Sequence, residues 1–224
     1  MLTESAAPRL GIIGFPPELS MYRSVLETTG LHRQAGDHWE FGPDPEHDPC
    51  NIKPLWQAID EFLSTTEMGK RSISELFDIL RRPPYGVKDG LLPIFLAAAI
   101  LHWDQEVALY ETGSFLPRIN IAAFERLMKE PEKFAIQRYR LSGVRSYLFE
   151  QYAALSPSAS AFTSRATLVG AVRPLIDAVK QLPAYTTSTK TLSAESMVVR
   201  DVITRAKEPH RLLFVDLPRA LGMD

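Results

Sequence analysis

Cysteine is almost absent from this sequence, which holds a single one, Cys50, among 224 residues. No internal disulfide can form, as is typical of proteins from a reducing compartment. Long hydrophobic runs are missing too, because the apolar run over 91–101 is shorter than the roughly 20 residues that cross a bilayer. The N-terminus also lacks the apolar stretch of a signal peptide. These absences predict a soluble, cytoplasmic protein without a membrane segment.

The motifs of nucleotide-binding and hydrolytic enzymes are missing as well. The pair Gly69-Lys70 is followed by Arg71 instead of Ser or Thr, and Ser64 stands where a P-loop has its first glycine. Gly11 and Gly14 lack the third glycine of a dinucleotide-binding turn. The sequence has no G-x-S-x-G elbow and no H-E-x-x-H helix. We therefore expect no enzymatic activity and no cofactor.

Neither sign of charge dominates, since the formal net charge is −2 and hydrophobic residues make up an ordinary 45%. The charges are unevenly spread, however. Residues 1–67 have a balance of −7, whereas residues 68–224 have a balance of +5. An acidic head on a mildly basic body is either self-complementary or separates surfaces with different partners. Ordinary surface composition is the plain alternative.

The first 50 residues predict little regular structure. Apolar residues at helical spacing over 18–29 predict a helix that ends at Gly30. Residues 38–41 have the pattern of a short strand inside a polar loop that contains several prolines. We therefore assign residues 1–50 to an acidic N-terminal segment with one helix and a loop.

The middle of the chain has the element order of a winged helix-turn-helix. Three stretches with helical spacing, the second capped by Ser72 or Ser74, are followed by alternation with a period of two. That change of period predicts a β-hairpin. An α+β domain that shares this order is the alternative. The expected elements are helices over 51–63, 71–82 and 91–101 and a hairpin over 106–120 that turns at Thr112-Gly113.

Further elements extend this winged-helix domain to residues 51–155. Asn120 is placed to cap a helix, residues 134–141 have the pattern of a third strand, and Ser142 is placed to cap another helix. A linker of small residues follows over 156–164.

The last third predicts a helical hairpin and a docking tail over residues 156–224. One apolar stripe starts at Leu168 and should be kinked by Pro174, and a second follows the cap residue Ser193. The apolar tail after Pro209 should dock on the fold. The sequence thus predicts a predominantly helical α+β protein with a winged helix-turn-helix domain and a C-terminal helical hairpin.

The helix over 91–101 bears on DNA binding, because it is the recognition helix of the expected winged helix. A recognition helix needs polar side chains that face the groove, and this one has none. A helix that is apolar all round belongs in the interior or against another protein element. The sequence therefore argues against direct base readout and favours a core or docking role.

Contact with the phosphate backbone stays open. Arg138 and Arg140 lie two residues apart in the expected third strand, so both should point the same way and could straddle a phosphate. Solvated surface is the plainer interpretation, because residues 106–150 balance seven basic residues with six acidic ones. The candidates for nucleic-acid contact are Arg118, Arg138, Arg140, Arg145, Lys70, Arg71 and Lys88.

A metal site has one hint, four possible ligands within nineteen residues. His47 and Cys50 have the two-residue gap that zinc ligands often show. The first two spacings match no zinc pattern, so an acidic, histidine-containing surface loop is the plainer interpretation. The candidate ligands are His32, His38, His47 and Cys50.

Several stretches resemble one family. These are RRPPYGVKDGLLPIFLAAAIL, EVALYETGSFLPRI, FERLMKEPEKFAIQRYRLSGVR and QLPAYTTSTKTLSAESMVVRDVITRAKEPHRLLFVDLPRALG. Over about residues 54–222 the chain is similar to the winged-helix-containing C-terminal region of large bacterial P-loop ATPases found in phage-defence gene clusters of the BREX kind. The resemblance implies a detached module or a separately encoded subunit. No catalytic residue carries over, since the ATPase motifs have no counterpart here.

We therefore expect a non-enzymatic protein-interaction module of a larger assembly, and the resemblance implies the ATPase or another defence subunit as its partner. The alternative is an accessory DNA-binding protein that contacts the phosphate backbone without sequence specificity. A metal-dependent enzyme built on the loop over 32–50 is a third hypothesis.

Overall fold

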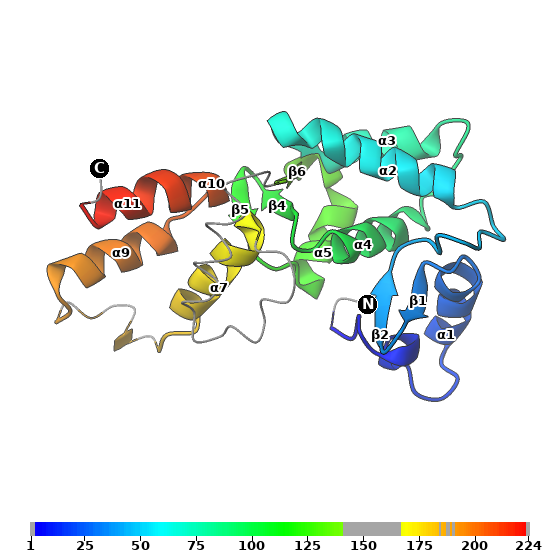
Figure 1. Ribbon diagram of the computed structural model, residues 1–224, viewed down its shortest axis with the longest axis horizontal. Coiled ribbons are helices and arrows are strands. Elements are labelled where there is room, and N and C mark those ends of the chain that lie inside the picture. The colour runs from blue at the N-terminus through cyan, green and yellow to red at the C-terminus, as the bar shows by residue number, and fades with distance from the viewer. Residues whose placement is uncertain (1–2, 141–166, 184, 187–188, 190, 223–224) are drawn as a thin grey trace. The chain divides into compact units, whose positions relative to one another are not determined.

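A computed structural model describes residues 3–140, 167–183, 185–186, 189 and 191–222 (Figure 1). The fold is mixed α/β, with more helix than strand in these residues. It divides into two compact units, one formed by Met1–Asp104 with Asn120–Glu132, the other by Gln105–Ile119 with Lys133–Asp224. These units follow other boundaries than the expected ranges 1–50, 51–155 and 156–224. In the described part of the chain, no helix combines the length and hydrophobicity needed to cross a membrane.

The N-terminal part of the first unit is a helix followed by a β-hairpin. After the short turn η1 (Pro8–Gly11), α1 (Pro17–Met21) continues as the π-helical turn η2 (Tyr22–Glu27), which confirms the predicted helix. Strand β1 (His32–Ala35) pairs antiparallel with β2 (His38–Phe41), in agreement with the strand predicted over 38–41. Strand β1 was not predicted, although a Gly-Asp turn between two short strands is a hairpin signal.

Three helices continue the first unit, as the periodicity predicts. They begin where the sequence provides a start: Asp48 accepts backbone N–H groups ahead of the first, and Ser72 caps the second. Asn120 caps a fourth helix by accepting the N–H of Ala123, as predicted. The elements are α2 (Lys53–Thr65), η3 (Thr66–Met68), β3 (Arg71–Ser72), α3 (Ile73–Arg81), α4 (Leu92–His102), α5 (Ile121–Lys129) and η4 (Pro131–Lys133).

Helix α4 is an interior element, as its composition predicts. Seven of its residues are buried, and they lie on all sides of the helix. At its C-terminal end His102 Nδ1 contacts the carbonyl of Phe41, which ties α4 to β2. Trp56 and Trp103 stack with ring centroids 5.1 Å apart beside the same histidine. Aromatic packing of this kind closes the first unit around α4.

The second unit is built on strands β4 (Val107–Glu111), β5 (Ser114–Leu116) and β6 (Phe134–Arg138). Strand β4 pairs antiparallel with both others, so Leu109 lies opposite Leu116 on one side and Ile136 on the other. The predicted turn at Thr112-Gly113 is confirmed, since both residues have positive φ.

The helices of the second unit pack on these strands. Strand residues Ala108 and Tyr110 share a core with Val172, Ile203 and Leu212. The tail docks as predicted and is helical. The helix expected over 142–155 and the linker over 156–164 lie outside the described residues. The elements are α7 (Leu168–Lys180), α9 (Ala194–Thr204), α10 (Pro209–Arg211), η6 (Leu212–Asp216) and α11 (Leu217–Ala220).

Candidate interaction surface

The strongest nucleic-acid candidate, Arg138, lies in the interior of the second unit. Its side chain is 2% exposed, and its Nε and Nη2 atoms lie 2.8 and 2.7 Å from a carboxylate oxygen of Glu106. Arg140 Nε lies 3.6 Å from the same oxygen. The two arginines thus approach one anion, and this anion is a carboxylate of the chain itself. The prediction that Arg138 offers its charge to a phosphate is corrected accordingly.

The reason lies in the alternation of β6. Phe134, Ile136 and Arg138 are its buried residues, whereas Ala135 and Gln137 are partly exposed. An arginine on the core-facing side must be paired, because a buried charge without a counterion is very costly. Glu106 lies just before β4, the partner strand, and supplies that counterion. Alternation along β6 therefore places Arg138 on the core-facing side, whereas the sequence analysis expected it to face a phosphate or solvent beside Arg140.

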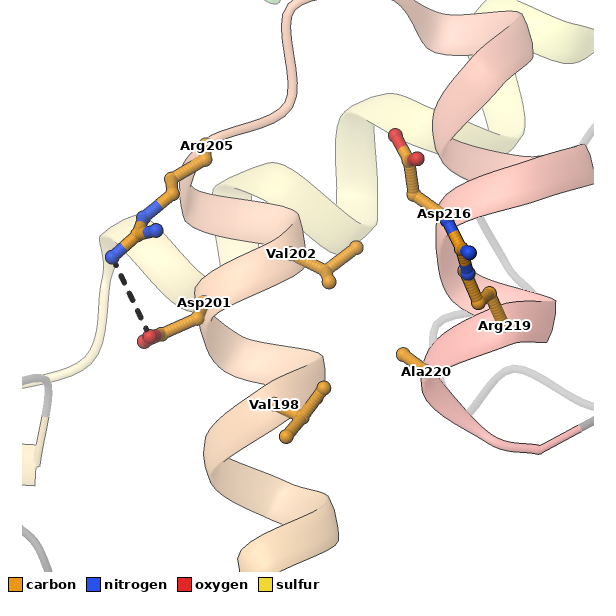
Figure 2. A pocket seen from close by; sticks show the side chains of 7 residues that line it. All are labelled: Val198, Asp201, Val202, Arg205, Asp216, Arg219 and Ala220. Carbon is orange, nitrogen blue, oxygen red and sulfur yellow. Dashed lines mark ion pairs between the residues drawn. The ribbon is translucent and has the colours of Figure 1, made fainter.

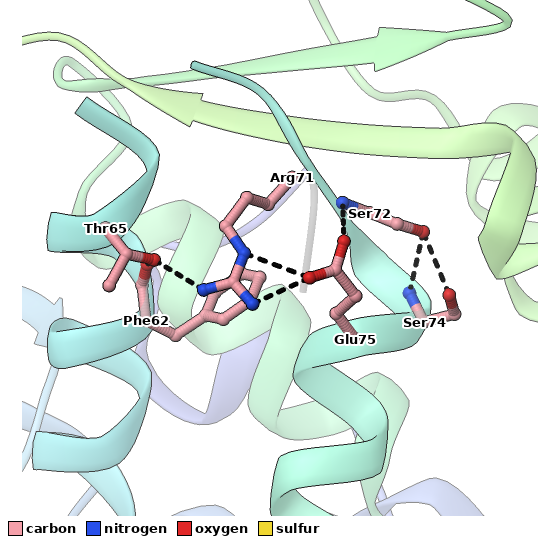
Figure 3. A network of polar contacts seen from close by, with 6 residues as sticks. All are labelled: Phe62, Thr65, Arg71, Ser72, Ser74 and Glu75. Carbon is pink, nitrogen blue, oxygen red and sulfur yellow. Dashed lines mark hydrogen bonds and ion pairs between the residues drawn. The ribbon is translucent and has the colours of Figure 1, made fainter. Parts of the chain in front are cut away.

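Arg71 belongs to a second internal network, drawn in Figure 3. Its Nε and Nη2 donate to Glu75 Oε2 at 3.0 and 2.6 Å, and its Nη1 donates to Thr65 at 2.7 Å. The guanidinium lies 4.6 Å from the ring centroid of Phe62. Hydrogen bonds from Arg71 and from the backbone N–H of Ser72 lower the pKa of the Glu75 carboxyl. Arg71 therefore holds the start of α3 in place.

The remaining basic candidates do not form one cluster. Arg118 is 74% exposed but donates to Asp177 at 2.7 Å, which joins the segment after β5 to α7. Lys70 is half-buried and Lys88 is exposed, both in the first unit. Arg145 lies outside the described residues. Among the candidates that the structure describes, Arg138 and Arg140 are brought together by Glu106.

The candidate metal ligands are not brought together either. His32 is buried, His38 lies 3.5 Å from Glu40, and the Cys50 thiol donates to the carbonyl of Thr28. Across the described ranges, no group of three or more His, Cys, Asp or Glu side chains is placed to hold a metal ion. The loop is held instead by hydrogen bonds within it, since the Asp44 carboxylate accepts the backbone N–H groups of Glu46 and His47.

His32 has a structural role that its bonds define. Its Nε2 lies 3.0 Å from the carbonyl of Ser5, which can only accept, so Nε2 carries the proton. Its Nδ1 then accepts from the hydroxyl of Tyr22 at 3.1 Å. The ring also packs against Phe41, with centroids 4.6 Å apart. Burial lowers the pKa of His32, so the neutral imidazole is the favoured form.

The most unusual surface of the first unit is a short apolar arm, residues 11–17, which runs from the last residue of η1 to the first residue of α1. Its side chains Ile13 and Phe15 are 93% and 88% exposed. On either side of the arm, Leu10 and Leu19 are buried. The arm is therefore fixed at both ends, and its two largest apolar side chains point into solvent.

The backbone of the arm is shaped to present these side chains. Gly11 and Gly14 have φ of +69° and +76°, a region that residues with a side chain rarely adopt. Pro16, at φ −71° and ψ 164°, has polyproline II geometry and leads directly into α1. The hydrogen bond from Ile12 N–H to the carbonyl of Arg9 closes the preceding turn at 3.1 Å.

The arm was not among the residues singled out from the sequence. Gly11 and Gly14 do not complete a nucleotide-binding turn, and neither Ile13 nor Phe15 lies in a periodic segment. A signal was present nonetheless, because an apolar stretch with two glycines and two prolines cannot bury its side chains as a helix or strand would. Such a stretch either packs in an irregular core or faces a partner, and sequence alone does not separate the two.

Comparison with known proteins gave no relative: no family model, curated protein or solved structure matches this chain. The resemblance to phage-defence ATPases therefore stays an expectation. Function has to be argued from the geometry of the chain itself.

Proposed function

We propose that this protein is a non-enzymatic interaction module of a larger assembly. The observation that carries the proposal is the exposure of Ile13 and Phe15 on an arm anchored by Leu10 and Leu19. The resemblance to the phage-defence ATPases makes the ATPase, or another subunit of that system, the first partner to test.

The arm exposes apolar side chains to water, so a partner that buries them would gain the free energy of that burial. Burying a side chain of the size of Ile or Phe stabilises a protein by about 1.5–3 kcal/mol. The fold holds both side chains in water, and its fixed backbone means that little conformational entropy is lost when a partner covers them. Exposed aromatic anchors beside a fixed backbone are typical of the residues that contribute most to protein–protein affinity.

The proposal includes a winged helix over residues 51–120. The order α2, β3, α3, α4, β4, β5 supports it, because a winged helix has helices and strands in this order. Helix α4 would be its recognition helix, and its burial supports an interior role for it over a role in base readout.

The DNA-binding alternative has lost its main support. Arg138, Arg71 and Arg118 each have a carboxylate partner within the chain. Contact with phosphates would then rest on Arg140, which lies 3.6 Å from Glu106, on the half-buried Lys70 and on the exposed Lys88. We expect a labelled duplex of about 30 base pairs to show no salt-dependent anisotropy change with the protein.

The arm can be tested by affinity purification of the full chain from cells in which it occurs naturally. The test variant is the double substitution Ile13→Asp and Phe15→Asp. A specific protein partner should copurify with the unaltered chain, and its amount should fall at least tenfold with the variant, since one such anchor contributes about 2 kcal/mol or more.

The control is Met68→Asp, which places one aspartate on another apolar side chain of the first unit that is 97% exposed. This control should retain the partner. If the partner is retained equally by both variants, or if only nucleic acid copurifies, the proposed role of the arm is wrong.

A further inference from the structure

A groove on the second unit lies between α9 and the C-terminal helical turns (Figure 2). Its volume is about 440 Å³. One wall comes from α9 and the other from η6 and α11, which pack against α9. The residues that line it are Val198, Asp201, Val202, Arg205, Asp216, Arg219 and Ala220.

The apolar part of the groove is a short stripe. Val198 and Val202 lie one turn apart on α9, and Ala220 approaches from α11 (Figure 2). Val198 is 47% exposed, and Ile203 is the one residue of α9 that is fully buried. Leu221, next to Ala220 in the sequence, is 54% exposed. The apolar surface left uncovered in the groove is therefore mainly that of Val198, and Leu221 adds exposed apolar surface beside Ala220 in the chain.

The charges of the groove are unequally matched. Asp201 is paired with Arg205 at 3.7 Å, and Asp216 is paired with Arg211 at 3.2 Å. The Arg219 side chain has no ion pair or hydrogen bond with any residue that the structure describes. Both carboxylates are thus neutralised within the unit, and one guanidinium is left beside the apolar stripe. An occupant that matches the groove carries a carboxylate at that point.

We infer that this groove binds an amphipathic helix whose apolar stripe is flanked by acidic residues. The lining residues on this wall run from Val198 in α9 to Arg205, the residue that caps its C-terminus, which is about two helical turns, or roughly 10 Å. A partner helix with apolar residues at i, i+3, i+4 and i+7 covers that length. The inference rests on the proposed role as an interaction module, but it concerns a surface other than the arm.

A helix fits these walls better than a small molecule does. Sites for small molecules bury about 70–90% of the ligand surface. Here the rim residues Asp201 and Arg205 have side chains that are 54% and 82% exposed, so a small ligand would stay largely in water. A helix satisfies its own backbone hydrogen bonds, so it needs from the groove only the apolar stripe to pack on and the guanidinium of Arg219 beside it.

The test uses the full chain and two fluorescein-labelled peptides of about 16 residues, long enough to form an isolated helix. Both peptides carry leucines at i, i+3, i+4 and i+7; one has glutamates on the flanks and the other has lysines. Fluorescence anisotropy should show that the acidic peptide binds about tenfold more tightly, a difference of about 1.4 kcal/mol. Arg219→Glu should remove or invert this preference, and Val198→Asp should weaken the binding of both peptides.

The control Lys180→Glu makes the same change of charge on an exposed residue of α7 and should leave the preference unchanged. Equal affinity for the two peptides, or a preference that survives Arg219→Glu, overturns the inference. The arm variant Ile13→Asp with Phe15→Asp should bind the acidic peptide normally. If it does not, the peptide binds the arm, so the groove assignment fails while the interaction role stands.

Discussion

Helices α4 and α9 have eleven residues each and opposite relations to solvent. In α4, seven residues are buried and no polar side chain precedes His102. In α9, only Ile203 is fully buried, although Met197, Val198 and Val202 continue an apolar stripe. The first helix is enclosed by its own unit. The second is covered on one side only.

The difference shows that apolar content alone does not tell whether a helix completes a core or offers a surface. The α4 sequence has no polar face, so no orientation could leave it in water without a large cost. The α9 sequence has charged residues at every turn, such as Glu195, Arg200 and Asp201, and these keep a half-covered helix stable in solvent. A surface of this kind can bind and release a partner. The apolar residues of α4, in contrast, become accessible to a partner only when the first unit unfolds.

The largest expected effect comes from breaking the enclosure of α4. Leu96 is 2% exposed, so Leu96→Ala removes buried methyl groups and leaves a cavity. We expect a loss of about 3–5 kcal/mol in the free energy of unfolding. Urea unfolding followed by tryptophan fluorescence measures this loss, because Trp39, Trp56 and Trp103 all lie in the first unit. A loss below about 1 kcal/mol would show that α4 is not enclosed.

A somewhat smaller effect is expected at the contact between β2 and α4. Gly42 has φ +130°, and a Cβ built there would lie 2.8 Å from the ring of His102. Gly42→Ala should therefore cost about 2–3 kcal/mol through backbone strain and crowding. The same urea titration detects it. Adding His102→Ala makes room for the new methyl group, so the two substitutions should be less than additive.

The same substitution, Ser to Ala at a helix N-cap, can be made in each unit, so that its effect on the stability of the two units can be compared. Ser72 caps α3 and Ser193 caps α9, each by accepting a backbone N–H at 3.2 Å. Ser72→Ala should lower the unfolding free energy of the first unit by about 1 kcal/mol. Ser193→Ala should leave the tryptophan-detected transition unchanged and shift only the loss of helical circular dichroism. A shift of the fluorescence transition by Ser193→Ala would mean that the units unfold together.

Acidification should weaken the first unit specifically. Because the pKa of folded His32 is lowered from its usual 6.5, the unfolded chain binds its proton at a higher pH than the folded chain does. The contribution of neutral His32 to the free energy of unfolding is then fully present above the unfolded pKa of about 6.5. It is lost as the pH falls from there toward the lower pKa of the folded state. The urea midpoint from tryptophan fluorescence should decrease between about pH 7.5 and 5.5. His32→Gln should flatten this dependence, and an unchanged slope would contradict the role given to burial.

The smallest effect is expected on α9. Val198→Ala removes two methyl groups from a side chain that is 47% exposed, so the unfolding free energy should change by no more than about 0.5 kcal/mol. Circular dichroism in urea measures it. A loss comparable to that of Leu96→Ala would show that the groove belongs to the core and would remove the basis for a docking helix.

Much of the local structure could be predicted from the sequence because it is encoded by neighbours. The caps at Ser72, Asn120 and Ser193, the turn at Thr112-Gly113 and the interior role of α4 each depend on a few adjacent residues.

The candidate sites could not be predicted because they depend on distant pairings. Glu106 and Arg138 are 32 residues apart, and Arg118 and Asp177 are 59 residues apart, so no spacing rule reveals that these charges neutralise each other. The exposure of Ile13 was equally hidden, since an apolar residue in a loop is buried or exposed according to what folds over it.

The division of the chain into interleaved units has a consequence for its synthesis. The first unit needs Asn120–Glu132, yet Gln105–Ile119 of the second unit emerges from the ribosome before that segment. Strands β4 and β5 are therefore synthesised before β6 and before the helices that cover them, and until then they can pair only with each other. A two-stranded hairpin is marginally stable on its own. Ribosome-bound chains that end between β5 and β6 should thus be the stage at which this protein most needs a chaperone.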